Sequence, residues 1–131
     1  MKRILFFLLL TLTTTIAFAQ TAADSTNVET VGNAPTYKLY KTQNMWVFIK
    51  LNTQTGRMKM VQYSISDDDD RGEFDLNIVN LAVGKKKING RFILTPTDNM
   101  WNFILLDQID GDVWQVQWSF EPRNRGVVKI E

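Results

Sequence analysis

The stretch NMWVFIKLNTQTGRMKMVQYS, residues 44–64, returns at residues 99–119 as NMWNFILLDQIDGDVWQVQWS. The match extends without a gap over residues 37–65 and 92–120. A repeat of this length is typical of a duplicated supersecondary unit whose copies pack together and bury a shared core. The sequence therefore predicts two tandem repeats.

Each repeat has the apolar and polar alternation of short β-strands. In the first repeat we expect strands at 37–40, 44–51, 57–65 and 73–77. In the second we expect a first strand at 91–95 and a fourth at 127–131, with the other two matched to the first repeat. The predicted fold is all-β: two four-stranded antiparallel repeats that form an eight-stranded barrel or sandwich with pseudo-twofold symmetry. A helix over 75–84 is the alternative for that segment, because four apolar residues there share one helical face.

Turn residues mark the links between these strands. Asn52 to Gly56 and Asp107 to Gly111 both open with an acceptor side chain and close with glycine. This pattern predicts a hairpin loop built on a type I turn, with the glycine in the left-handed conformation. Asn89-Gly90 predicts a further hairpin turn before the second repeat.

The second strand of each repeat is apolar on both sides, so it is either covered on both faces or exposes an apolar one. The third strand of the second repeat differs, because its apolar and polar residues alternate. Trp114, Val116, Trp118 and Phe120 share one face, and Gln115, Gln117 and Ser119 share the other. That alternation predicts a strand with one solvated side. The first repeat follows it less cleanly.

The N-terminus resembles an export signal. Lys2 and Arg3 precede a short apolar run, and Ala17-Phe18-Ala19 supplies small residues at a cleavage site. We therefore expect a signal peptide at 1–19, a flexible leader at 20–36 and one β domain at 37–131. Within that domain the repeats span 37–77 and 91–131, with a connector at 78–90. The mature chain is then periplasmic or extracellular, with no transmembrane segment.

Composition excludes several chemistries. Without Lys2 and Arg3, 13 of the 15 basic residues remain against 14 acidic ones, so the mature chain has no long-range attraction to nucleic acid. The chain has no cysteine and no histidine. It therefore has no Ser-His or Cys-His nucleophile and neither the thiolate nor the imidazole ligands of zinc sites. We expect no cofactor.

Aromatic and amide side chains recur together in both repeats. Indole and phenyl rings cover the apolar face of a sugar or an extended peptide, and amides give and accept its hydrogen bonds. The alternative is that the rings belong to the core and the asparagines satisfy turn backbone. The candidate ligand-binding residues are Asn44, Trp46, Phe48, Gln62, Asn99, Trp101, Phe103 and Gln117.

Acidic residues gather around one turn: Asp107, Asp110 and Asp112, with Asp98 on another loop. Oxygen ligands this close suit calcium, but turn chemistry accounts for the pattern and we expect no metal. A carboxylate pair for glycoside cleavage needs two acids across a cleft, and no pattern places them so. The charge runs 67–70 and 85–87 are expected to be solvated loops.

The paired strings quoted above, with INGRFILTPT (88–97), resemble a group of small exported β-repeat proteins of gut Bacteroidetes without an assigned function. The resemblance covers nearly all of residues 37–131 and implies an envelope or extracellular location but no activity. A weaker likeness links LNTQTG (51–56) to the turn of quinoprotein-type propeller blades. Two blades cannot close a ring, so this likeness implies shared hairpin geometry.

Three functions remain open from the sequence. The first is a non-catalytic binding protein of the cell envelope that recognises a glycan, a peptide or a partner protein. The second is a structural protein that forms a homo-oligomer through its two-sided apolar strands. The third is a carboxylate-dependent hydrolase. We expect a binding role and no enzyme activity.

Overall fold

The computed structural model describes residues 30–66 and 71–131. The predicted signal peptide, the first part of the predicted leader and the acidic run at 67–70 lie outside these residues. The described part is all-β, as predicted, and consists of two four-stranded antiparallel sheets. Sheet 1 contains β1 (Tyr37–Lys41), β2 (Val47–Asn52), β3 (Met58–Gln62) and β4 (Gly72–Asn77). Sheet 2 contains β5 (Phe92–Pro96), β6 (Asn102–Asp107), β7 (Val113–Gln117) and β8 (Gly126–Ile130).

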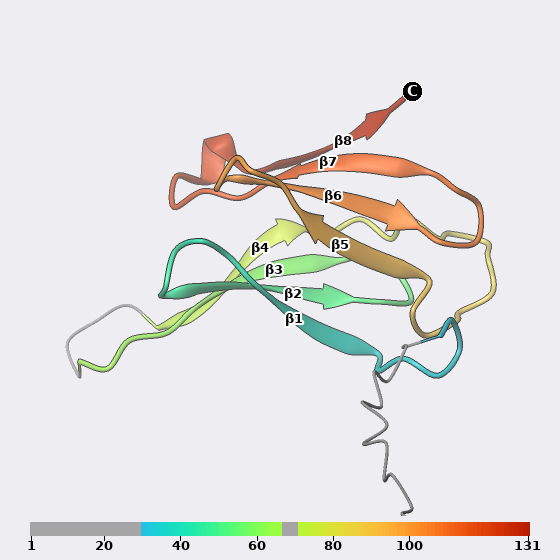
Figure 1. Cartoon of the computed structure of the whole chain (residues 1–131), viewed down its shortest axis with the longest axis horizontal. Helices are drawn as coiled ribbons and strands as arrows, with labels where there is room; N and C mark the ends of the chain where they lie inside the picture. Colours follow the sequence, from blue (N-terminus) through green and yellow to red (C-terminus); the bar gives the residue numbers. More distant parts are fainter. Residues whose placement is uncertain (1–29, 67–70) are drawn as a thin grey trace, which may run out of the picture.

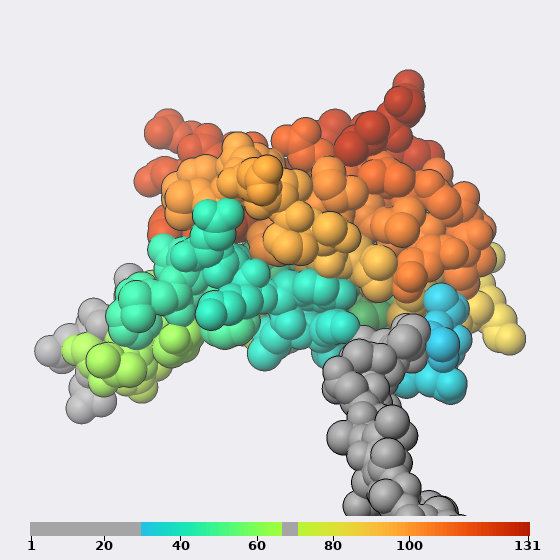
Figure 2. Space-filling view, in the orientation of Figure 1, coloured from blue at the N-terminus to red at the C-terminus, as the bar shows by residue number. Residues whose placement is uncertain are grey.

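Each sheet is a meander in which every strand pairs with the next one along the chain. The sheets lie one over the other as two layers (Figure 1), with β5 beside β2 and β8 beside β4. They do not close into a barrel, so of the two predicted closures the structure has the sandwich. In the space-filling view the teal and green layer of sheet 1 packs directly against the orange layer of sheet 2 (Figure 2).

The alternative of a helix over 75–84 is wrong. β4 runs to Asn77, and turns follow from Leu81 to Gly84. The Asn77 side chain holds this segment in place: its Nδ2 donates to the Gly56 carbonyl at 2.8 Å, and its Oδ1 accepts from the Val79 amide at 3.1 Å. In the described part of the chain the one helical element is the 3-10 turn η1 (Pro122–Asn124).

Backbone pairing recurs at equivalent positions of the two predicted repeats. Tyr37 pairs with Asn52 as Phe92 pairs with Asp107, and equivalent pairs recur along the whole of β2–β3 and β6–β7. The hairpin loops match too, because the amides of Gly56 and Gly111 donate to the carbonyls of Asn52 and Asp107. The register of β5–β7 therefore follows that of β1–β3. The last pairing differs, because β3–β4 shifts at a bulge between Met58 and Lys59 and β7–β8 does not.

The two sheets do not use equivalent faces for the core. Sheet 1 buries Ile49 and Leu51 of β2, whereas sheet 2 buries Phe103 and Leu105 of β6. Ile104, the counterpart of Ile49, is on the other side of its sheet and partly exposed. Phe48, the counterpart of Phe103, is also partly exposed. We call the side of each sheet that meets the other sheet its inner face, and the opposite side its outer face.

This inversion bears on the predicted pseudo-twofold axis. A twofold axis between two stacked sheets brings equivalent faces together, whereas here the inner face of one repeat corresponds to the outer face of the other. The third strands show the same exchange: Trp114 and Val116 are buried in β7, as predicted, but Met58 and Met60 are buried in β3. The burial pattern therefore does not support the twofold relation and matches two sheets stacked in the same sense.

The last residues of the predicted leader are held against the domain. The Gly32 amide donates to the Asn89 carbonyl at 2.7 Å, and the Thr36 carbonyl accepts from the Thr53 amide at 2.8 Å. Thr53 is buried, and its hydroxyl donates to the Pro35 carbonyl and accepts from the Gly90 amide. The Asn89-Gly90 turn is present, but it joins the two sheets and closes no hairpin.

The hairpin glycines have the predicted left-handed backbone, with φ of 72° at Gly56 and 79° at Gly111. A Cβ at Gly111 meets nothing within 4 Å, so Gly111→Val tests backbone strain alone. We expect it to lower the free energy of unfolding by about 1–3 kcal/mol, because a β-branched residue resists positive φ. Asp112→Asn in the same loop removes an exposed ion pair with Lys129 and is expected to cost under about 1 kcal/mol. Equal costs in urea denaturation would contradict this turn geometry.

Candidate functional site

The outer face of sheet 2 presents a row of four aliphatic side chains, one from each strand. Ile93 pairs with Leu106, Leu106 with Val113, and Val113 with Ile130. Ile130 is 47 % exposed, and the other three are partly exposed. Side chains at directly paired positions lie in contact across a sheet, so this row is a continuous apolar band across the whole face.

A second row runs beside the first: Thr95, Ile104, Gln115 and Val128 occupy paired positions on the same side. Val128 is 66 % exposed. None of the paired positions on this outer face carries a charged side chain. Among the described strands this is an uncharged surface with six aliphatic residues, and such surfaces mark interaction sites in soluble proteins.

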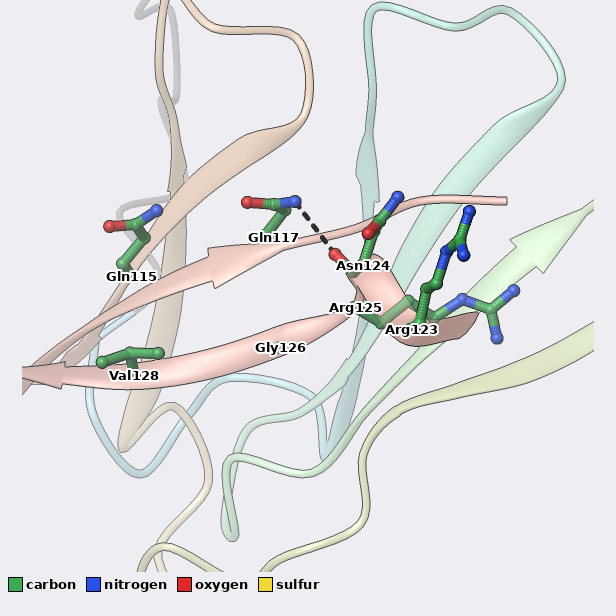
Figure 3. Close-up of a pocket in the computed structure, with 7 residues that line it drawn as sticks. All are labelled: Gln115, Gln117, Arg123, Asn124, Arg125, Gly126 and Val128. Carbon is green, nitrogen blue, oxygen red and sulfur yellow. Dashed lines mark hydrogen bonds between the residues drawn. The ribbon is translucent and has the colours of Figure 1, made fainter. Parts of the chain in front are cut away.

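The polar end of this face contains an open hollow of about 270 Å³ (Figure 3). Gln117 Nε2 donates to the Asn124 carbonyl at 2.9 Å, which fixes the loop that carries η1 against β7. Arg125 is fixed as well, since its guanidinium donates to the carbonyls of Ser119 and Phe120. Arg123 is exposed and extends away from the sheet. The lining residues are Gln115, Gln117, Arg123, Asn124, Arg125, Gly126 and Val128.

The predicted asparagines serve the backbone. Asn44 Oδ1 accepts from the Trp46 amide and Asn99 Oδ1 from the Trp101 amide, both at 2.9 Å. These bonds make a turn before each second strand, which is why β2 and β6 begin later than predicted, at Val47 and Asn102. The Asn44 and Asn99 acceptors predicted for a ligand are therefore occupied by turn amides.

The predicted aromatic residues are not gathered at one site. Phe103 is 2 % exposed and belongs to the core, because its strand turns that face inward. This is the alternative given above for the aromatic rings. Trp46 and Phe48 contact the Tyr63 ring, with centroids 5.4 and 6.0 Å away. The Trp101 ring contacts the buried Trp118 ring at a tilt of 44°, with centroids 4.7 Å apart.

The two predicted glutamines differ in the same way as the strands that carry them. Gln117 lies on the outer face of sheet 2, in the hollow, whereas its counterpart Gln62 pairs with Val47 on the inner side of sheet 1. The eight predicted residues are thus divided between the core, two turns and two faces. Gln117 alone among them lines the hollow beside the aliphatic rows.

The acidic turn is compensated by cations. Asp107, Asp110 and Asp112 place carboxylate oxygens within 4.8 Å of one another. Arg91 Nη2 lies 2.7 Å from both Asp107 and Asp110, and Lys85 pairs with Asp110. The hydrogen bond from Lys85, together with the nearby Arg91 charge, lowers the pKa of Asp110. These contacts use the acceptors that a cation needs.

Asp112 is paired separately. The Lys129 amine lies 2.9 Å from its carboxylate, and this hydrogen bond raises the pKa of Lys129. Salt bridges therefore join the turn that carries the three acids to Arg91 in front of β5, to Lys129 of β8 and to Lys85 of the connector.

The sequence alone does not predict the aliphatic rows on the outer face of sheet 2. The second strand of each repeat is apolar on both sides, but neither that pattern nor the repeat shows which side faces the other sheet.

In the part of the chain that the structure describes, no helix has the length and hydropathy needed to span a bilayer. No protein family, curated protein or solved structure matches the chain.

Proposed function

We propose that this chain is a non-catalytic binding protein of the cell envelope that recognises the surface of another protein through the outer face of sheet 2. The observation that carries the proposal is the uncharged aliphatic surface described above. The cores of protein interfaces are depleted of charged residues and rich in apolar ones. A neutral glycan needs a hydrogen-bonding group near each hydroxyl, and the aliphatic rows supply few.

The repeat supports the same role. On this proposal the sheets are two copies of one unit, which is exported with the signal peptide. Stacking the copies in the same sense leaves the outer face of sheet 2 uncovered, and this face corresponds to the face that forms the core in sheet 1. Ile104 and Leu106 are identical to Ile49 and Leu51, the residues that fill the core from β2. A sheet face whose side chains match those of a buried core face is suited to burial against a partner.

Catalysis is not supported by the carboxylates. A general acid or nucleophile must be free to reach a substrate, whereas the three acids of the β6–β7 turn are bonded to Arg91, Lys85 and Lys129. Their arrangement favours a structural role.

The proposal is tested by site-specific photocrosslinking in cells that make the protein. Benzoyl-phenylalanine at Val128 is expected to give a protein adduct, because this position lies on the outer face of sheet 2. The matched control is Val83, which is 74 % exposed but lies in the connector, outside both sheets. Absence of any protein adduct at Val128, or equal adducts at both positions, would contradict the proposal.

A further inference from the structure

We infer that the partner seated on the outer face of sheet 2 is a second copy of this chain, which binds it with the outer face of its own sheet 1. This inference rests on the proposed function and names its partner. The copies then stack head to tail, and each junction repeats the packing that already joins sheet 1 to sheet 2 inside one molecule.

The outer face of sheet 2 corresponds, through the repeat, to the inner face of sheet 1. Ile104 and Leu106 match Ile49 and Leu51, which are fully buried against sheet 2. Counted from the matching dipeptides Arg71-Gly72 and Arg125-Gly126, which are 54 residues apart, Val128 corresponds to Phe74, which packs against the core. The face left open on sheet 2 is thus the one that sheet 1 uses to make the internal contact.

The outer face of sheet 1 corresponds, in the same way, to the inner face of sheet 2. Its apolar side chains include Leu39 and Tyr63, which are 57 % and 41 % exposed. Their counterparts Leu94 and Trp118 are both buried in the core. The two ends of the molecule therefore present faces that correspond, through the repeat, to the two halves of the internal interface. On the outer face of sheet 1, Lys50 and Lys59 stand in place of the buried Leu105 and Trp114.

Charge at the centre of the outer face of sheet 1 is internally balanced. Lys50 and Glu73 form an ion pair, and Lys59 Nζ lies 3.3 Å from Asp75. The uncharged outer face of sheet 2 therefore covers paired groups there, which limits the desolvation cost of burial. In contrast, two copies of sheet 2 placed face to face would leave both outer faces of sheet 1 exposed.

Equivalent turns of the two stacked sheets also lie next to each other. Gln43 in the β1–β2 turn contacts the carbonyl of Asp98, its counterpart in the β5–β6 turn. Equivalent hairpins thus lie side by side, as in sheets related by a simple repeated step. A contact of this kind uses different patches on the two copies, so its repetition gives a ring or an open filament.

The test uses one blocking substitution for each face, analysed by sedimentation velocity over a hundredfold range of concentration. Leu39→Asp blocks the outer face of sheet 1 and Val128→Asp that of sheet 2; both side chains are more than half exposed, so the fold is retained. We expect the natural chain to assemble, each variant alone to be monomeric, and a 1:1 mixture of the two variants to form a heterodimer through the one intact junction. Val83→Asp is the matched control and should assemble like the natural chain.

Two results would overturn the inference. A natural chain that stays monomeric up to millimolar concentration excludes self-stacking, while a Val128 crosslink to a different protein would leave the binding role intact. Assembly of Leu39→Asp at the level of the natural chain, together with loss in Val128→Asp, would show that two copies of sheet 2 meet face to face. Circular dichroism and a urea midpoint for each variant establish that it is folded.

Discussion

Replacing Asp107 with alanine is expected to lower the free energy of unfolding by about 3–5 kcal/mol. The Asp107 carboxylate is fully buried, and Arg91, which is 3 % exposed, donates to it from Nε at 3.0 Å and Nη2 at 2.7 Å. The substitution leaves a buried guanidinium with only Asp110 as a charged partner at Nη2. When one member of a buried ion pair is removed, the other stays buried without the attraction that offset its cost of desolvation.

The repeat supplies the matched control for this prediction. Asn52 occupies the equivalent position, and like Asp107 it accepts two amides of its own turn through its side-chain oxygen. Asn52→Ala removes those bonds without stranding a charge, and should cost about 1 kcal/mol. Urea denaturation at neutral pH measures both variants. Costs of similar size would show that the ion pair does not stabilise the fold as argued.

Trp118→Ala is expected to cost about 3–5 kcal/mol, the usual range for a buried aromatic residue. Trp118 is fully buried, its Nε1 donates to the Met100 carbonyl at 2.8 Å, and its ring contacts Trp101 and Phe120. A loss of this size is a large part of the roughly 5–15 kcal/mol that stabilises a typical domain, so the variant should be partly unfolded at low urea.

Tyr63→Ala is the equivalent substitution in the first repeat. It shows whether the cost of Trp118→Ala comes from burial of the ring or from its position in the repeat. Tyr63 is 41 % exposed on the outer face of sheet 1, and its ring contacts Trp46 and Phe48. Because truncation there removes little buried surface, Tyr63→Ala is expected to cost about 1 kcal/mol. If Tyr63→Ala were as costly as Trp118→Ala in the monomeric protein, the two residues would occupy similar environments and the inversion of faces would be contradicted.

Much of the fold follows from local signals in the chain. The constant offset between the repeats and the turns ending at Gly56 and Gly111 predict strand order and register, because turn chemistry and alternation are properties of neighbouring residues. Strand ends were less well predicted. Asn44 and Asn99 bond the amides two residues on, which delays the start of β2 and β6. Such a bond competes with strand pairing and is not visible in hydrophobic alternation.

The candidate site was predicted less well than the fold, for a physical reason. A strand such as β2 or β6 has apolar residues on both sides, so its own pattern does not determine which side is buried. The choice depends on the stacking of the two sheets, which is a tertiary property. Phe48 and Phe103 therefore share a sequence context but have opposite environments. Which face of sheet 2 is the outer one depends on how the two sheets are stacked.

Cysteine labelling gives the most direct test of this account, since the chain has no native cysteine. Single cysteines at the equivalent positions Ile49 and Ile104, and at Phe48 and Phe103, are treated with a maleimide under native conditions. Leu39→Asp and Val128→Asp are present in every variant so that assembly covers neither outer face. We expect cysteines at 104 and 48 to react rapidly and those at 49 and 103 to be protected. Equal reactivity within each equivalent pair would contradict the stacked, same-sense arrangement on which the binding surface depends.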